Sequence, residues 1–274
     1  MKYSLNKTAP LILLLALPAR ALTRVQYVMG TACEITAEGP AAAQGLSAAF
    51  AEIARWDGVL SLYNKESEAS RMNREAAAGP FACSESLWEA VAASQDYRLK
   101  SGGAFDASLG SGKVRLDPAN RSVRFLKRGM SLDFGGIGKG IALDHAALAL
   151  RQAGVRSAFI NFGGQVYALG DAPGRSGWPV RLEDGRELSL RDASASTSGN
   201  AEQPGHIVSP FSREKILSGG SVTVVAPSAA EADAWSTALF VRGAPDSYAG
   251  CSLAGPAASP ACAPYLQSYK GEHP

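Results

Sequence analysis

Cysteine, histidine and charged residues are all scarce in this chain. Its 274 residues include 4 Cys and 3 His, and charged residues make up 19%. No two Cys have the Cys-x-x-Cys spacing, so the sequence gives no support to a zinc or thioredoxin-type site. The formal net charge is only +2, which excludes the global basic field typical of nucleic-acid-binding proteins. The composition also lacks the patterns of collagen, coiled coils and multi-span membrane proteins.

The apolar content is that of a globular protein. Hydrophobic residues make up 46% of the chain, which is too high for a disordered protein, and 29 Gly indicate many tight turns around a buried core. The length fits one large domain or two small ones, and no linker-like stretch divides the chain convincingly.

The first 21 residues have the layout of a secretory signal peptide. Lys2 and Lys7 precede an unbroken apolar run at 11–17, and Ala19-Arg20-Ala21 is a small-x-small cleavage site. The run is much shorter than the ~20 residues that span a bilayer. A short membrane anchor or a buried core helix is the alternative. We expect cleavage near Ala21, a periplasmic protein and no membrane span after cleavage. Loss of Lys2, Lys7 and Arg20 takes the net charge to −1.

Export changes the interpretation of the four Cys. Cys251 and Cys262 are close in the sequence, and a disulfide between them is plausible in an oxidising compartment. We expect Cys33 to be a buried thiol in a strand, whereas Cys83 could be either free or paired.

Hydrophobic periodicity predicts both helices and strands along the chain. Ser228, with Glu231 three residues later, forms a capping box that opens the last helix. We expect residues 246–274 to be an irregular tail because they are rich in Pro and Gly. Helices are expected at 41–62, 84–100, 139–152 and from 228 onward. A strand pair or one long strand is expected at 24–38, and further strands at 113–115, 122–125, 130–134, 158–162, 165–169, within 178–198, and at 221–226.

The glycine-rich segment 131–140 is the first candidate site. We expect a strand to feed a tight turn that opens a helix, with Lys139 at the mouth. Unpaired N–H groups at a helix start, together with a cation, can bind an anion such as phosphate. The segment is not a P-loop, since Gly140 stands where Ser or Thr would bind magnesium. An ordinary tight turn is the alternative.

Asp233, Ser236 and Thr237 form the second candidate. Their spacing of i, i+3 and i+4 places them on one helix face. A carboxylate with two hydroxyls suits a hard cation such as Mg²⁺, and we expect Asp233 to be partly solvated. A solvated polar face, or hydroxyls bonded back to the helix, is the alternative.

Two loops supply further candidates. Phe105 and Asp106 follow flexible glycines, so an aromatic ring and an acceptor could meet a planar ligand; an ordinary turn with a buried Phe105 is the alternative. His206 is the best candidate for a general base. We expect His145 on a helix surface and His273 at the chain end, and a structural histidine is the alternative for His206.

These segments, in this order, resemble the ApbE-type family of FAD:protein FMN transferases, over roughly residues 24–243. The matching segments are Met29-Gly30-Thr31, Leu60-Ser-Leu-Tyr63, Ser67-Glu68 with Asn73, Gly103-Ala-Phe-Asp106, the D-F-G-G-I-G-K-G block at 133–140, Asn161-Phe-Gly-Gly164, Thr197-Ser-Gly199, His206-Ile207, the strand at 221–227 and Ala232-Asp-Ala-Trp-Ser-Thr237.

The resemblance implies a fold and a reaction. It implies an α+β protein with the ApbE-like fold, with mixed, mostly antiparallel sheets and packed helices, and a main domain that spans residues 22–245. Members of this family use magnesium to cleave FAD, transfer FMN to a Thr or Ser hydroxyl of an acceptor protein, and release AMP. The acceptor would be a flavoprotein subunit of an exported or membrane redox complex.

The resemblance also implies roles for matched residues. Those at the cofactor would be Met29 and Tyr63 at the flavin, Ala104, Phe105, Asp106, Asp133 and Ile207 in the FAD pocket, and Lys139 at the phosphates. Those at the metal would be Asp233, Ser236, Thr237 and the carbonyl of Gly136. His206 would activate the acceptor hydroxyl.

The sequence departs from the family pattern in two places. Ser209 replaces an Asp in the segment after His206, and the segment between Asp106 and Lys113 is unusually short. Two alternative functions therefore remain, a magnesium-dependent FAD pyrophosphatase and an exported protein that binds FAD without turnover.

Overall fold

An eight-stranded antiparallel sheet forms the centre of the molecule. The computed structural model describes residues 21–182, 185–200, 205–217, 220–243, 248–255 and 257–266. The strand order is β1-β2-β6-β7-β10-β11-β12-β13, and every neighbouring pair is antiparallel. The bounds are β1 Leu22–Val28, β2 Thr31–Ala37, β6 Ala158–Phe162, β7 Gln165–Leu169, β10 Ala193–Gly199, β11 Ser221–Ala226, β12 Cys251–Ala254 and β13 Ala257–Ala258.

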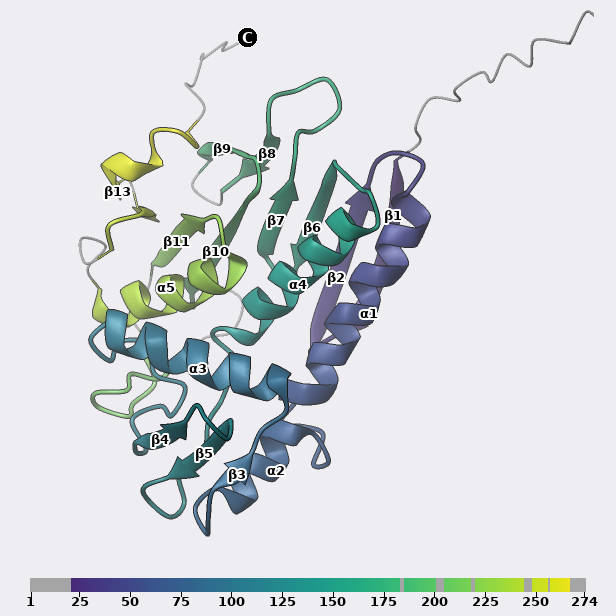
Figure 1. Cartoon of the computed structure of the whole chain (residues 1–274). Helices are drawn as coiled ribbons and strands as arrows, with labels where there is room; N and C mark the ends of the chain where they lie inside the picture. The colour runs from purple at the N-terminus through teal and green to yellow at the C-terminus, as the bar shows by residue number, and fades with distance from the viewer. Residues whose placement is uncertain are drawn as a thin grey trace, which may run out of the picture.

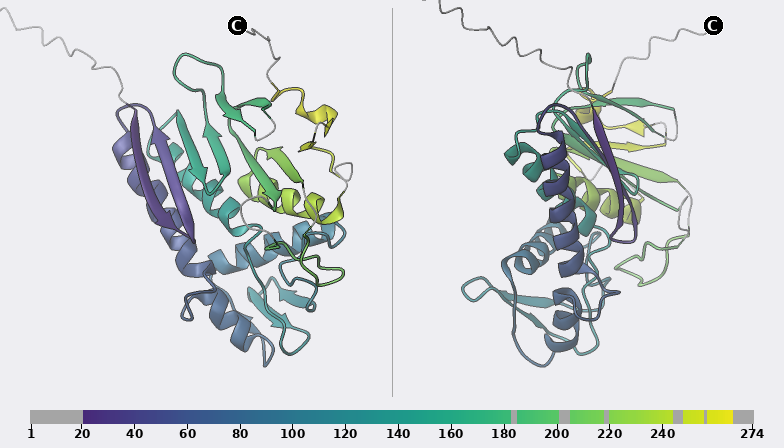
Figure 2. Two further views of the ribbon diagram at one scale, coloured as in Figure 1. Left: turned by 180° about the vertical axis from the view of Figure 1, so that it is seen from behind. Right: turned by 90° about the vertical axis from the view of Figure 1, so that its right-hand side faces the viewer.

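Three helices cover one face of this sheet, as Figures 1 and 2 show. They are α1 (Ala42–Leu60), α4 (Gly138–Gln152) and α5 (Ala229–Arg242), and the main hydrophobic core lies between them and the sheet. A smaller core lies on the other face, where Val166 and Ala168 alternate with Tyr167 and Leu169 of the main core. The hairpin of β8 (Trp178–Arg181) and β9 (Glu187–Leu190) contributes to the smaller core.

A second layer of structure lies below the sheet in Figure 1. It contains α2 (Glu68–Glu75), α3 (Glu85–Lys100) and a small antiparallel sheet in the order β3-β5-β4. These strands are β3 (Phe81–Ala82), β4 (Val114–Asp117) and β5 (Ser122–Phe125). The expectation of an α+β fold with mostly antiparallel sheets is confirmed.

Local signals explain the helix boundaries. The Ser84 hydroxyl accepts from the Leu87 N–H at the start of α3, and the Ser228 hydroxyl accepts from the Glu231 N–H at the start of α5. Gly243, at φ 64°, ends α5 in the left-handed conformation that glycine tolerates. The Glu231 carboxylate accepts from the Tyr248 hydroxyl, a role that the expected capping box did not include.

Two expectations about the elements were wrong. Residues 130–134 form no strand, although Met130, Leu132 and Phe134 are buried. The backbone of Leu132 is instead paired with the side chain of Asn73, at 2.8 and 2.9 Å. The expected irregular tail contains β12, which pairs with β11 and extends the main sheet.

The cysteine expectations were confirmed. Cys251 and Cys262 form a disulfide, Cys33 is buried in β2, and Cys83 is a half-buried free thiol. The expected signal peptide, apart from residue 21, and His273 lie outside the described residues. Within the described part of the chain, no helix is long and apolar enough to cross a bilayer.

Candidate functional site

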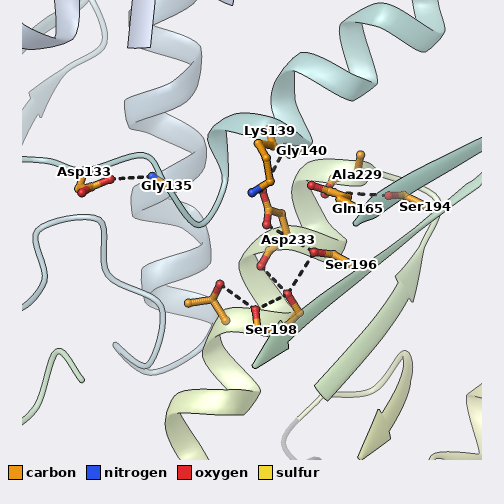
Figure 3. A network of polar contacts seen from close by, with 12 residues as sticks. Asp133, Gly135, Lys139, Gly140, Gln165, Ser194, Ser196, Ser198, Ala229 and Asp233 are labelled. Atoms are coloured by element: carbon orange, nitrogen blue, oxygen red, sulfur yellow. Dashed lines mark hydrogen bonds and ion pairs between the residues drawn. The ribbon is translucent and has the colours of Figure 1, made fainter. Parts of the chain in front are cut away.

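Asp233 lies where the first turns of α4 and α5 meet the sheet, and Figure 3 shows it among its partners. The residue is only 4% exposed. Its Oδ2 accepts from the Gly140 N–H at 3.1 Å and lies 3.9 Å from Lys139 Nζ, while its Oδ1 lies 3.4 Å from the Ser196 hydroxyl. The first turn of α4 therefore presents both an N–H group and a cation to this carboxylate.

Burial governs the charge of Asp233. It raises the pKa of the carboxyl group above its ordinary value, while Lys139, the Gly140 N–H and the Ser196 hydroxyl oppose that shift. The expectation that Asp233 is partly solvated was therefore wrong, because α5 packs this face against β10. A carboxylate held in this way is stabilised by a cation placed beside it.

Hydroxyl groups from β10 and α5 surround the carboxylate. Ser198 Oγ lies 2.9 Å from Ser236 Oγ and 3.4 Å from Thr237 Oγ1. The Ser236 hydroxyl donates to the Asp233 carbonyl at 3.0 Å and lies 3.4 Å from Ser196 Oγ. The sequence analysis placed Ser236 and Thr237 here correctly but gave no role to Ser196 and Ser198. The alternation of serines at 194, 196 and 198 was the available signal, since alternate residues of a strand share one face.

Gly136 approaches this cluster from the turn before α4. A Cβ atom at this glycine would lie 3.1 Å from Thr237 Oγ1 and 3.3 Å from the Phe105 ring. The backbone of the turn is therefore packed against the hydroxyl of Thr237. All four residues expected at the metal lie in one neighbourhood.

The donor set fits a magnesium ion that is shared with a phosphate. Oxygen ligands are the ones Mg²⁺ prefers, and it commonly takes one or two carboxylates and completes its shell with water and substrate phosphates. Asp233 supplies one buried carboxylate, and hydroxyl and carbonyl oxygens surround it. No group of three or more His, Cys, Asp or Glu occurs in the described ranges, so these residues do not form an all-protein metal cage.

Gln165 was missed by the sequence analysis. It is 2% exposed, and its amide nitrogen donates to the Ala229 carbonyl at 2.8 Å and lies 3.5 Å from Ser194 Oγ. Its amide oxygen is buried and has no partner among the described groups. An unpaired buried acceptor costs about 1–3 kcal/mol, so this atom marks a place where a water molecule or ligand group would be stabilising.

The residues expected in the FAD pocket are in different environments. Ala104 and Phe105 are buried, and Asp106 Oδ2 accepts from Arg98 Nε at 3.0 Å. Asp133 is exposed, and its Oδ1 accepts from the Gly135 N–H at 2.7 Å. The carboxylate of Asp106 is thus committed to an internal ion pair, whereas that of Asp133 shapes the exposed turn before α4.

Met29 and Tyr63 lie at opposite extremes of exposure. Met29 is half-buried, and its Cε would lie 3.6 Å from a Cβ atom at Gly138 in the first turn of α4. Tyr63 is 99% exposed. Met29 therefore lies beside the proposed phosphate site, and the Tyr63 ring is open to a planar ligand.

His206 begins a loop whose base is attached to the end of β10. Its side chain is exposed, whereas the next residue, Ile207, is 7% exposed and pairs its carbonyl with the Ile216 N–H at 2.9 Å. Asn200 Nδ2 donates to the Ile216 carbonyl at 3.0 Å. The loop is therefore fastened to the strand that carries Ser196 and Ser198.

His145 is less exposed than expected. It is half-buried on α4, where its Nε2 lies 2.8 Å from Glu89 Oε1 and its ring packs against Trp56 with 4.9 Å between centroids. It links α1, α3 and α4, which is a structural role.

Comparisons with known proteins agree with this fold. A model described as the ApbE family matches residues 29–113 and 109–255. The chain is 28% identical over 288 residues to a FAD:protein FMN transferase of Treponema pallidum (strain Nichols), covering 82% of this chain and 79% of that one. It is 29% identical over 285 residues to a FAD:protein FMN transferase of Rhodobacter capsulatus, covering 85% of this chain and 53% of that one. The chain therefore spans about half the length of this second relative.

Two solved structures show the same fold. The flavin transferase ApbE from Vibrio cholerae matches with a TM-score of 0.73 and 22% identity, covering 82% of this chain and 87% of that one. The apo form of the Pseudomonas stutzeri flavinyl transferase ApbE matches with a TM-score of 0.74 and 24% identity, covering 85% of this chain and 87% of that one.

Proposed function

We propose, because this chain belongs to the ApbE family, that it transfers FMN from FAD to a Thr or Ser hydroxyl of an acceptor protein and releases AMP. Relatives named FAD:protein FMN transferase support the activity. The observation that carries the proposal is the buried Asp233 carboxylate, which faces Lys139 and the first turn of α4 amid hydroxyl oxygens. This arrangement suits a pyrophosphate that is bound together with a hard cation.

Each residue of the site then has a role. Lys139 and the N–H groups at the start of α4 bind the pyrophosphate and neutralise part of its charge. Asp233, Ser236, Thr237 and the carbonyl of Gly136 would hold a magnesium ion, which when bound neutralises the rest. Positioning and charge stabilisation account for most of the catalysis of phosphoryl transfer.

His206 would act as the general base. It would take the proton of the acceptor hydroxyl, whose oxygen forms a bond to the phosphorus of the FMN half, and the bond between that phosphorus and the bridging oxygen breaks as AMP leaves. Its exposed position at the start of a loop suits a group that meets a second macromolecule.

The flavin and adenosine portions would use the remaining expected residues. Met29 would contact the flavin, and Tyr63 would stack on it. The other expected contacts are Ala104, Phe105, Asp106, Asp133 and Ile207. Because Asp106 is paired with Arg98, we propose that it shapes the pocket through its backbone and its ion pair.

The departure at Ser209 is compatible with transfer. The Ser209 hydroxyl accepts from the Phe211 N–H at 3.3 Å and lies 3.5 Å from the Ser212 nitrogen. Asp and Ser make the same kind of local turn through their side-chain oxygens. The replacement therefore preserves the shape of the loop after His206.

We propose that the protein is exported to the periplasm. The charged and apolar segments at the N-terminus and the expected cleavage site near Ala21 support this location. The acceptor would then be a flavoprotein subunit of an exported or membrane redox complex.

Release of AMP from FAD tests the function directly. The mature chain is incubated with FAD and magnesium, with and without a periplasmic flavin-acceptor subunit, and the acceptor is analysed by mass spectrometry. The proposal predicts AMP release that depends on the acceptor, together with covalent FMN on it. AMP without acceptor would identify a FAD pyrophosphatase, and intact bound FAD without AMP would identify a binding protein.

His206 has a separate test. His206→Ala should lower FMN transfer throughout roughly pH 6 to 9, while FAD binding is kept. An unchanged rate across this range would remove His206 as the base.

A further inference from the structure

The hairpin of β4 and β5, with its flanking residues 113–128, is the most basic segment of the described chain. It has one acidic residue, Asp117, so its net charge is +5, while the chain as a whole carries only +2. All of its cationic side chains are exposed. They are Lys113, Arg115, Arg121, Arg124, Lys127 and Arg128.

These six cations differ from most others in the molecule. Arg98, Lys100 and Arg151 form ion pairs, whereas none of the six makes an ion pair or side-chain hydrogen bond with any residue that the structure describes. Arg115 and Arg124 are directly opposite each other on the paired strands, an arrangement that is destabilising for like charges. The hairpin therefore keeps a concentration of positive charge that its own fold does not neutralise.

Four of the cations surround a hollow. Arg115, Arg124, Lys127 and Arg128, together with Leu126, line a depression of about 310 Å³. Low-dielectric walls lined by one sign of charge focus the field and attract groups of the opposite sign. The shape and charge of this surface suit carboxylate or other anionic groups on a partner.

The basic hairpin lies beside the loop that carries His206, as Figures 1 and 2 both show. The short segment 109–112 lies between them. Gly110 has no room for a side chain because it packs against the carbonyl of Pro210, and a Cβ atom at Gly112 would lie 3.5 Å from Lys127 Cβ. This segment, which is short compared with the family pattern, packs against both the loop and the hairpin.

The hairpin is also close to the phosphate site along the chain. Arg128 and Asp133 are only five positions apart, a span of about 18 Å at most. A macromolecule that binds the hairpin is thus within reach of both the His206 loop and the turn before α4.

We propose that the basic hairpin is the docking surface for an acidic segment of the acceptor protein. The proposal rests on the transferase function argued above and adds the chemistry of the partner. A lipid surface is the less suitable occupant, because a bilayer lying on the hairpin would cover the adjoining loop and separate His206 from a protein hydroxyl. Within residues 113–128, Leu126 is the one large apolar side chain that is strongly exposed, whereas interfacial membrane segments insert several.

A charge-reversal pair tests the surface. The double variant Arg124→Glu, Arg128→Glu is compared with the control Arg156→Glu, Arg175→Glu, which changes the same net charge at exposed positions outside the hairpin. Glu at position 124 would face Arg115, so the fold should be kept, and thermal unfolding checks this. The probe is a fluorescein-labelled acidic peptide that contains one Thr, followed by anisotropy at low and high salt.

The expected result is specific to the hairpin. The hairpin variant should bind the peptide at least ~10-fold more weakly at low salt, and the salt dependence of binding should shrink, while the control binds like wild type. In FMN transfer to the acceptor subunit, the KM for that subunit should rise with little change in kcat. Equal peptide affinity in the three proteins, or an unchanged KM, would overturn the proposal.

Two further arms separate the alternatives. The protein should not bind vesicles of phosphatidylcholine and phosphatidylglycerol. If the hairpin binds these vesicles and does not bind the peptide, the proposal is overturned in favour of a membrane surface. If the wild type binds the peptide through the hairpin but releases no AMP with any acceptor, the transferase function fails while the acidic-segment docking surface stands.

Discussion

At the scale of residues, the buried Asp106 and Asp233 and the half-buried Asp144 are stabilised in different ways. Asp106 pairs with Arg98, and Asp144 accepts from the Ser228 hydroxyl and from the N–H groups of Ala229 and Ala230. Asp233 has one N–H group and an ammonium at 3.9 Å. The first two arrangements are structural, and the third leaves a carboxylate that a ligand cation would stabilise.

The Arg98–Asp106 pair should be important for stability. Asp106 is 4% exposed at its side chain, so Arg98→Met would leave a buried charge without its partner and lower the free energy of unfolding by about 3 kcal/mol. The control is Lys100→Met in the same turn of α3, where the pair with Asp96 is exposed on both sides. Lys100→Met should change the free energy of unfolding by less than about 0.5 kcal/mol. Equal effects in denaturant unfolding would contradict this assignment.

His145 should make stability depend on pH. Its hydrogen bond to Glu89 raises its pKa above the ordinary 6.5, although burial and Arg55 oppose this. A raised histidine pKa means that the added stability is complete below pH 6.5 and is lost as pH rises through the folded-state pKa. Because the pair is partly exposed, the effect should be roughly a few tenths of a kcal/mol. The free energy of unfolding of His145→Gln should depend less on pH in this window than that of wild type. An unchanged pH profile of stability would show that His145 is not its source.

At the scale of elements, the contact between α4 and α5 determines the geometry of the site. Gly140 packs against the first turn of α5, where a Cβ atom would lie 2.6 Å from Ala230 Cα and still closer to the Ala229 carbonyl. The same glycine donates its N–H to Asp233. Close helix packing and carboxylate binding therefore depend on one residue.

Gly140→Ala should separate the two helices. Backbone atoms cannot yield as a flexible side chain can, so we expect a loss of about 1–3 kcal/mol in the free energy of unfolding. Gly58→Ala in α1 is the matched control, because a Cβ atom there meets nothing within 4 Å. It should stabilise by roughly 0.5–1 kcal/mol through helix propensity. Thermal unfolding of both variants measures this, and stabilisation by both would refute the packing argument.

The disulfide should stabilise the far edge of the main sheet. Cys251 lies in β12 and Cys262 eleven residues later, so the bond closes a short loop against the smaller core. Reduction should lower stability by about 2–3 kcal/mol in the chain-entropy model. A Cys251→Ala, Cys262→Ala variant should be equally destabilised and should not respond to reductant. If reductant destabilised that variant, another cysteine would be responsible for the effect of reduction.

Regular elements with local signals could be predicted from the sequence. Strands 158–162, 165–169 and 221–226 agree residue for residue, and the serine caps fixed the starts of α3 and α5. Segment 130–134 was predicted wrongly because its alternating burial matches a strand, while its hydrogen-bond partner is a side chain on α2, distant in sequence. Helix α2 was missed because it is short and mostly polar.

The site shows the same division between local and distant signals. Helical spacing predicted the cluster on α5, because Asp233, Ser236 and Thr237 lie within two turns. Ser196, Ser198 and Gln165 reach the cluster from β10 and β7, and such contacts depend on strand register rather than on local pattern. The burial of Asp233 also depends on this tertiary packing.

At the scale of the whole molecule, the functional residues lie between the main sheet and the smaller layer. In the proposed function, the helix starts of α4 and α5, shown in Figure 3, bind the phosphate and the cation. The His206 loop and the basic hairpin lie side by side toward the smaller layer (Figure 1). One surface can therefore receive FAD and a protein partner together, as transfer between them requires.

The most direct test of the account is FMN transfer by Asp233→Asn. This substitution keeps the size of the side chain and removes the charge. Because burial raises the pKa of Asp233, the neutral amide should leave the metal-free fold at least as stable as wild type at neutral pH. We predict that magnesium-dependent transfer to the acceptor falls by roughly 100-fold or more and that magnesium no longer raises the unfolding temperature. A folded Asp233→Asn protein that transferred FMN at the wild-type rate in limiting magnesium would contradict the account.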